Sequence, residues 1–313
     1  MRARKDLREP IVVSGCSTIV DAMNTIRWIC LIILLETPPL PGITPNAVEM
    51  EIANLAINHP DQGRPTMVYD STLNVVARAK ALDLARRAYF AHVDPDGYGP
   101  NKAVQLAGYG LPSWWGTGLD SNYIESIGGG YVSAQAAFDG WMGSAGHRRH
   151  VLAETDFYAG QTRYGVGYAE LSGSPYRRYY VFITAPPNEN GNTLLDPYIE
   201  WMFGHFTPKE IDTLGDASDI DGDGIGRLVE FVLQFDPRKS ERMPAATLNV
   251  AARRLEWRLP VRPGLGSVTA RIERSLDLRS WSAAGVQNSG GIFSIDTQAR
   301  SGFMRLVVTR DGE

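Results

Sequence analysis

The spacing of apolar residues changes along this chain, and the change restricts which folds the chain can adopt. Up to about residue 142, apolar residues recur at intervals of three and four, which places them on one face of successive helices. Strand-like runs follow at residues 165–169 and 178–184, and beyond Pro237 apolar and polar residues alternate. We therefore expect helices that flank a small sheet, an α+β or layered α-β-α domain, followed by a small all-β module.

Local signals place the helices of the first region. Asn46 can cap a first helix, and Asp70 or Ser71 can cap a longer second helix that runs to about Ala88, with Ala88 on its buried side. Shorter helices are expected at about residues 102–107 and 133–142. These helices would pack on the sheet formed by the later strand-like runs.

Length and turn-rich breaks divide the chain into four expected segments. With 313 residues, about two domains and a small additional module are expected. The boundaries that we predict are 1–44 for a signal peptide or disordered N-terminal segment, 45–188 for the helical domain, 189–237 for a linker and 238–313 for a β-sandwich-like module.

The N-terminal segment has features of a targeting signal. If translation starts at Met23, Arg27 supplies a positive charge and Trp28 to Leu35 supply eight apolar residues. This run is too short to cross a bilayer, so we expect no transmembrane span in the mature chain and a secreted or cell-envelope location. A frayed arm on a cytoplasmic protein is the alternative, because no small-residue cleavage site follows the run.

Composition excludes some classes of function. Hydrophobic residues make up 43% and charged residues 21% of the chain, which suffices for a sizeable core. The net charge of −4 argues against nucleic acid or an anionic membrane as partner, because both require clustered positive charge. Both cysteines, Cys16 and Cys30, lie near the N-terminus, so disulfides cannot hold the folded part together.

Residues 219–230 have the spacing of a twelve-residue calcium-binding loop of the EF-hand type. Positions 1, 3, 5, 6, 7 and 12 carry, in order, Asp219, Asp221, Asp223, Gly224, Ile225 and Glu230. Four carboxylates and the backbone carbonyl at position 7 can converge on calcium, which takes roughly six to eight oxygen ligands. Arg227 at position 9 cannot supply an oxygen, so water would replace it. An acidic turn without an ion is the alternative.

Three polar residues of the helical region are candidates for a shared site. His92 follows the long helix, Glu125 precedes a run of glycines, and His147 follows the helix expected at 133–142. Two imidazoles and a carboxylate can bind zinc or another divalent cation, a polar ligand, or a proton in transfer.

Two further residues near His147 are candidates for the same site. Ser144 is a conceivable nucleophile with His147 as its base, although no Gly-x-Ser-x-Gly motif marks nucleophilic chemistry. His150 could join the site, but we expect it on a solvated helix face beside Arg148 and Arg149.

Seven sequence blocks between about residues 47 and 187 follow the order of a known family. They are Tyr69 to Asn74, Tyr89 to His92, Asp94 to Gly97, Ala107 to Tyr109, Asn122 to Ile127, Trp141 to Arg148 and Tyr164 to Tyr168. The blocks resemble those of the CAP superfamily, the SCP-like domain of cysteine-rich secretory, antigen 5 and pathogenesis-related proteins. The resemblance implies an α-β-α sandwich with a cleft lined by two histidines and two acidic residues.

The resemblance also assigns residues to the cleft. His92, Glu125 and His147 match both histidines and one acidic residue of the family, and Ser144 stands where the second acidic residue falls. The part from about Phe206 resembles the ends of large secreted proteins of Verrucomicrobia-like bacteria, with a calcium loop followed by a β module.

Three hypotheses about function follow. The first is a secreted or cell-envelope CAP protein that binds a small hydrophobic or polar ligand, or a cell-surface polymer. Lipids and sterols are suggested as ligands only by the resemblance to the CAP superfamily. The second is a metal-assisted hydrolase that acts on peptide or cell-wall polymer at His92, Glu125 and His147. The third is a structural surface protein with a vestigial cleft.

Overall fold

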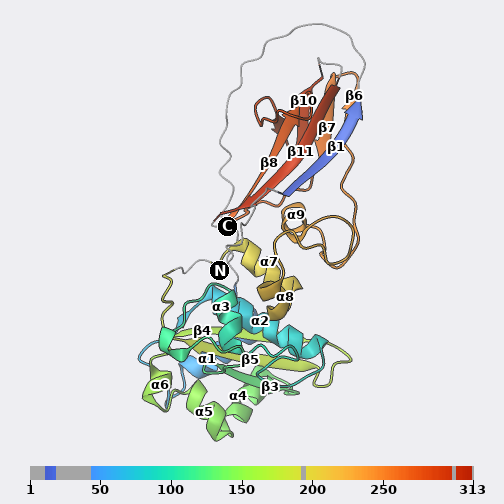
Figure 1. Ribbon diagram of the computed structural model, residues 1–313. Coiled ribbons are helices and arrows are strands. Elements are labelled where there is room, and N and C mark those ends of the chain that lie inside the picture. The colour runs from blue at the N-terminus through green and yellow to red at the C-terminus, as the bar shows by residue number, and fades with distance from the viewer. Residues whose placement is uncertain (1–10, 19–43, 192–194, 298–300, 312–313) are drawn as a thin grey trace, which may run out of the picture. The chain divides into compact units, whose positions relative to one another are not determined.

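The chain forms two compact units. The computed structural model describes residues 11–18, 44–191, 195–297 and 301–311 (Figure 1). One unit spans Pro41–Leu214, and the second contains Gly215–Glu313 together with the strand β1, Ile11–Thr18. The expected signal run Trp28 to Leu35 lies outside the described residues.

The first unit contains helices on both sides of a four-stranded sheet (Figure 1). Its helices are α1 (Ala47–Ile57), α2 (Ser71–Arg86), α3 (Pro100–Leu106), the 3-10 turn η1 (Ser113–Trp115), α4 (Ala134–Met142), α5 (Ala145–Val151), α6 (Asp156–Ala159), α7 (Pro197–His205) and α8 (Pro208–Thr213). Its strands are β2 (Val68–Tyr69), β3 (Glu125–Gly129), β4 (Arg163–Glu170) and β5 (Arg178–Ala185). Their order is β2-β4-β5-β3, with β5 antiparallel to both neighbours and β2 parallel to β4.

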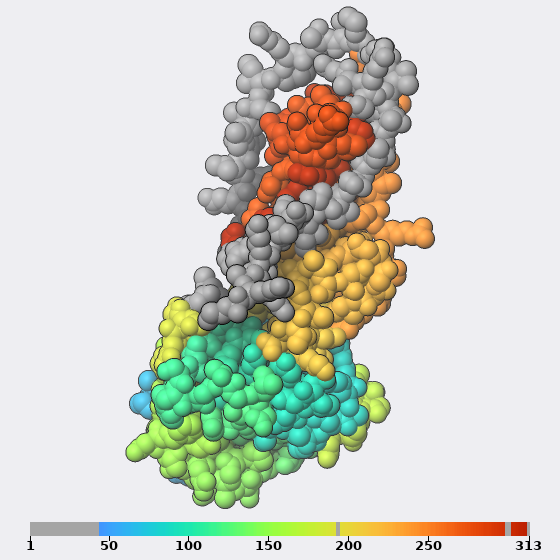
Figure 2. All heavy atoms as spheres, viewed as in Figure 1, coloured from blue at the N-terminus to red at the C-terminus, as the bar shows by residue number. Residues whose placement is uncertain are grey.

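Alternate residues of the central strand β5 point into two separate cores. Tyr179, Val181 and Ile183 pack with α2 and α3, whereas Tyr180 and Phe182 pack with α1, α4 and α5. Side chains of α2 and α3, in cyan and teal, gather on one face of the unit in Figure 2. The predicted α-β-α sandwich is therefore confirmed.

The helix caps explain where α1 and α2 begin. Asn46 and Glu49 form a capping box at α1, and the Asp70 carboxylate accepts hydrogen bonds from the amides of Thr72 and Leu73. The prediction for Ala88 is wrong: α2 ends at Arg86, and Ala88 is exposed with a φ of 56°. A left-handed residue reverses the chain there, so it cannot continue the buried helix face.

In its described residues, the second unit has one helix and two small sheets. Its helix is α9 (Arg227–Leu233), and its strands besides β1 are β6 (Thr247–Asn249), β7 (Arg254–Arg258), β8 (Val268–Ser275), β9 (Gln287–Ser289), β10 (Ile292–Asp296) and β11 (Ser301–Arg310). The sheet orders are β1-β11-β8 and β6-β7-β10-β9, all antiparallel. These sheets fit the expected β module, and β1 lies in the segment expected to be a signal peptide or disordered.

Within the described ranges, no helix combines the length and the apolar character needed to cross a membrane.

Candidate functional site

His92 and Glu125 form a close pair at the edge of the sheet. Nδ1 of His92 lies 2.8 Å from Oε1 of Glu125, the first residue of the edge strand β3. The Glu125 side chain is 1% exposed and that of His92 is 37% exposed. Because a carboxylate accepts hydrogen bonds, Nδ1 is the donor in this pair, and the tautomer that fits the pair has its lone pair on Nε2. His92 therefore offers Nε2 to a ligand.

Local hydrogen bonds hold both members of this pair. The amide oxygen of Asn122 accepts from the backbone N–H of Glu125 at 2.9 Å, which fixes the start of β3. Lys80 of α2 donates to the carbonyl of His92 at 2.7 Å and to the hydroxyl of Tyr89 at 2.9 Å. Burial lowers the pKa of Lys80, and the nearby Glu125 opposes that shift. Lys80 thus attaches the loop that carries His92 to α2. The sequence did not mark Lys80 as part of the site.

One oxygen of the Glu125 carboxylate is available for a further interaction. Its Oε2 atom is buried and has no hydrogen-bond partner among the residues that the structure describes. Leaving a buried carboxylate oxygen without a donor costs free energy, so a bound cation or a ligand donor would compensate that cost.

His147 lies on α5, on the other side of the sheet from α2. Burial lowers its pKa, and the neighbouring His92 lowers it further, so His147 is favoured as the neutral imidazole. In the described part of the chain, only Asp219, Asp221 and Asp223 bring three potential metal-ligand atoms within 4.8 Å of one another. The trio therefore does not form a three-ligand chelate; the arrangement is a His92–Glu125 pair with His147 within electrostatic range.

Ser144 begins the helix that carries His147. It is the N-cap residue of α5, and its hydroxyl makes no capping hydrogen bond. No hydrogen bond joins its hydroxyl to His147 among the described contacts, so the structure does not contain the serine–histidine pair that nucleophilic catalysis requires.

The prediction that His150 lies on a solvated helix face is wrong, because the residue is buried. The residue is 4% exposed, and its ring nitrogens lie 2.8 Å from the hydroxyls of Ser126 and Thr184. Burial, followed by the positive charge of Arg64, holds the pKa of His150 well below its usual value. His150 therefore fastens α5 to β3 and β5.

Arg64 reinforces the same attachment. Its guanidinium donates to the carbonyls of His150 and Val151 at 2.7 Å and to the carbonyl of Gln161 at 2.8 Å. The last carbonyls of a helix lack intrahelical donors, so Arg64 caps the C-terminal end of α5. Arg64 and His150 together hold the helix that presents His147.

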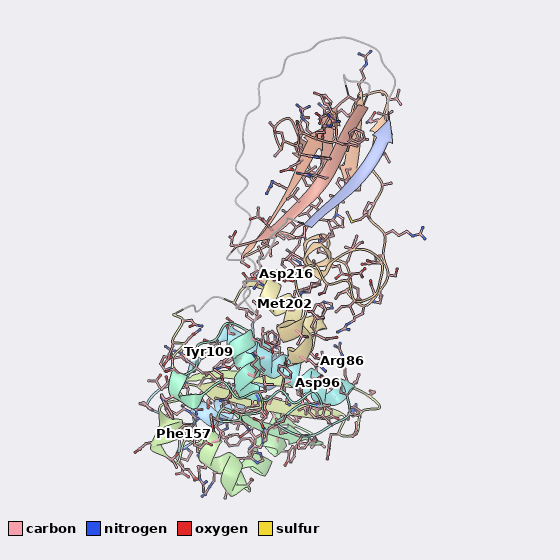
Figure 3. All side chains as sticks on the ribbon, viewed as in Figure 1. Arg86, Asp96, Tyr109, Phe157, Met202 and Asp216 are labelled. Carbon is pink, nitrogen blue, oxygen red and sulfur yellow. The ribbon has the colours of Figure 1, made fainter. Side chains whose placement is uncertain are left out.

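The aromatic residues of the long loop divide between core and surface. Tyr109 (labelled in Figure 3) and Trp115 are buried. The hydroxyl of Tyr109 donates to the carbonyl of Pro186. Trp114 is 74% exposed and meets Phe157 of α6 edge-on. Tyr109 and Trp115 therefore belong to the core.

The acidic loop of the second unit also has a defined geometry. Asp219, Asp221 and Asp223 offer oxygens within 4.8 Å of one another. The backbone N–H of Ile225 donates to Asp223, and Glu230 is almost completely buried at the start of α9. Arg227 pairs with Asp216, at 3.2 Å.

Comparison with protein families identifies the first unit. The sequence model of the CAP family, described as the cysteine-rich secretory protein family, matches residues 20–184, which is more than half of the chain. The chain belongs to the CAP family. The match includes His92, Glu125 and His147. These residues lie in the first unit, Pro41–Leu214, which we call the CAP unit.

Similar proteins are bacterial. The uncharacterized protein YkwD of Bacillus subtilis is 31% identical over 137 residues, which is 44% of this chain and 48% of that protein. The chain thus spans about half the length of this curated relative. Two solved structures match 44% of the chain: an extracellular SCP-domain protein from Bacillus anthracis (21% identity, TM-score 0.35, 40% of that chain) and an outer surface protein from Borrelia burgdorferi (15%, 0.34, 91%).

Proposed function

We propose that the CAP unit is a binding domain that acts outside the cytoplasm and holds a small polar ligand through a divalent cation at His92 and His147. The observation that supports this proposal best is the His92–Glu125 pair, in which a buried carboxylate orients an imidazole and leaves its Nε2 available. Carboxylates orient metal-binding histidines in this way in many proteins.

The donor chemistry of these residues suits a zinc ion with an open coordination sphere, and the electrostatic effect of His92 on His147 places the two imidazoles near each other. His92 and His147 supply imidazoles, Glu125 orients His92, and water or a ligand oxygen would complete the site. A bound cation would supply a Lewis-acidic centre for a polar ligand. The interactions that the site offers are polar, which favours a polar ligand or cell-surface polymer over a lipid or sterol.

An extracellular location is part of the proposal. It is supported by the short positive region and the apolar run from Trp28 to Leu35. Mass spectrometry of the intact mature protein recovered from the host would test it, since removal of a signal peptide leaves a new N-terminus.

Zinc titration of the metal-free full-length protein tests the cation site. We expect one zinc ion per chain, no measurable binding after His92→Ala, and about 10- to 100-fold weaker binding after Glu125→Gln, because the amide orients the imidazole less well. The matched control is His59→Ala, since His59 accepts a hydrogen bond from Asp61 outside the site. Equal zinc affinity in all variants would disprove the site.

The hydrolase alternative has a separate test. A screen with peptide and cell-wall polymer substrates should show no turnover that depends on His147. Turnover that His147→Ala abolishes in a folded variant would replace the binding function with catalysis.

A further inference from the structure

The acidic loop at residues 219–230 is organised around its first aspartate. Asp219 Oδ1 accepts backbone hydrogen bonds from Gly222 and Asp223, and its Oδ2 accepts one from Gly224, at 2.8 to 3.2 Å. Gly224 has a φ of 88°, which a residue with a side chain rarely adopts. The loop therefore folds tightly enough to bring Asp221 and Asp223 beside Asp219.

Asp221 contributes an oxygen that the protein itself does not use. Its Oδ1 accepts from the backbone N–H of Asp223, whereas Oδ2 is buried without a hydrogen-bond partner among the described residues. An exposed acidic turn would hydrate such an oxygen, so its burial is an observation separate from the clustering of the three aspartates.

Glu230 points to a ligand independently of the loop geometry. The residue is 1% exposed, and no described contact gives its carboxylate a hydrogen bond. In a loop of this spacing the residue at the twelfth position can supply both of its carboxylate oxygens to the ion. A buried carboxylate without a hydrogen-bond donor, in the same loop as three clustered aspartates, is unfavourable unless a cation compensates the charge.

We propose that this loop binds one calcium ion through Asp219, Asp221, Asp223, the backbone carbonyl of Ile225 and Glu230. All of these ligands are oxygens, which calcium prefers, and Glu230 can give two of them. Arg227 stands at the ninth position of the loop, but its guanidinium is paired with Asp216, so it places no competing charge in the site. Water completes the coordination there.

The contacts of the loop indicate what the ion stabilises. Asp223 Oδ2 accepts from the backbone N–H of Glu241 at 2.8 Å, and Glu241 in turn accepts from the N–H of Asp236 at 3.0 Å. An ion that fixes Asp223 therefore also fixes residues 236–241, which lead from α9 towards β6. The calcium ion is a structural brace within the second unit.

Limited trypsin digestion of the chelator-treated full-length protein locates the effect. Arg238 and Lys239 are exposed in the braced segment, Arg242 is exposed directly after it, and Arg177 is an exposed internal control in the CAP unit. With saturating calcium we expect cleavage after residues 238, 239 and 242 to slow about tenfold or more, and cleavage after Arg177 to stay unchanged. Equal cleavage with calcium and chelator would overturn the proposal, as would equal protection by the same concentration of magnesium.

Two variants separate binding from folding. Glu230→Gln removes the buried charge but keeps the shape, so it should melt no lower than the parent in chelator and lose the calcium-induced rise in Tm, which we expect to be about 4 °C or more in the parent. Asp296→Asn, on β10, is the control and should keep the full rise. Retention of the rise in Glu230→Gln would overturn the assignment.

Discussion

His150 is buried between the hydroxyls of Ser126 and Thr184, and charging it there is unfavourable. Its pKa in the folded protein lies well below the value of about 6.5 that it has in an unfolded chain. As the pH falls through 6.5, the unfolded state binds the proton first. The stability that neutral His150 provides is therefore complete above that pH and is lost progressively below it.

Urea unfolding between pH 7.5 and pH 5.5 measures this effect. We expect the free energy of unfolding of the parent to fall with decreasing pH, with His150 contributing a slope of up to about 1.4 kcal/mol per pH unit. His150→Asn should be less stable at pH 7.5 but have a shallower slope; part of the slope remains because the pKa of His147 is lowered too. Parallel slopes in the two proteins would contradict the assignment.

The site residues differ in how far the sequence reveals them. His92, Glu125 and His147 lie in sequence blocks with a recognisable order, so the sequence was sufficient to select them as candidate site residues. His150 has two arginines beside it, and its partners lie 24 and 34 residues away in the chain. Only the pairing of β3 with β5 brings those hydroxyls together, so local periodicity cannot identify His150 as buried.

At the level of elements, α2 lies directly against β4, and two glycines allow this. A Cβ at Gly167 would lie 2.1 Å from the backbone of Ala77, and one at Gly165 would lie 2.2 Å from that of Asn74. Backbone atoms cannot move aside as a flexible side chain can. We expect Gly167→Ala to destabilise the CAP unit by at least about 3 kcal/mol, measured by urea unfolding.

The matched control for this substitution is Gly146→Ala on α5. No atom lies within 4 Å of a Cβ built there, so stability should be unchanged or slightly raised, because alanine favours helix. If Gly167→Ala unfolds at the same urea concentration as this control, α2 does not need the close approach.

The strand β3 shows why some elements escape prediction. Its residues Glu125 to Gly129 include two glycines and little β-branched or aromatic character, so local propensity does not favour a strand. Pairing with β5 and the hydrogen bond from the indole of Trp141 to the carbonyl of Ile127 stabilise it instead. The long helices α1 and α2 were predictable because their caps and apolar faces agree.

At the scale of the whole molecule, the helices α7 and α8 belong to the CAP unit although the sequence indicated a linker there. Tyr198, Met202 (Figure 3) and Phe203 of α7 are buried, and Phe203 packs in the same core as α2. We expect a fragment of residues 44–214 to melt at least about 5 °C above a fragment of residues 44–188, measured by circular dichroism.

The zinc affinity of the two fragments supplies the control. The site residues are present in both, so the longer fragment should bind zinc as the full chain does. Equal melting temperatures would show that α7 contributes no stability to the CAP unit and that the boundary lies near residue 188.

The alternation of β3 has a consequence for how this region can vary. Glu125 lies opposite Ile183 and faces the α2 layer, whereas Ser126 lies opposite Phe182 and faces α5. A single-residue insertion or deletion that shifted this register would exchange the two faces, and both His92 and His150 would lose their partners at once. Insertions and deletions are therefore tolerable in the loops on either side of β3. Within β3, only substitutions leave the His92–Glu125 and His150–Ser126 contacts in place.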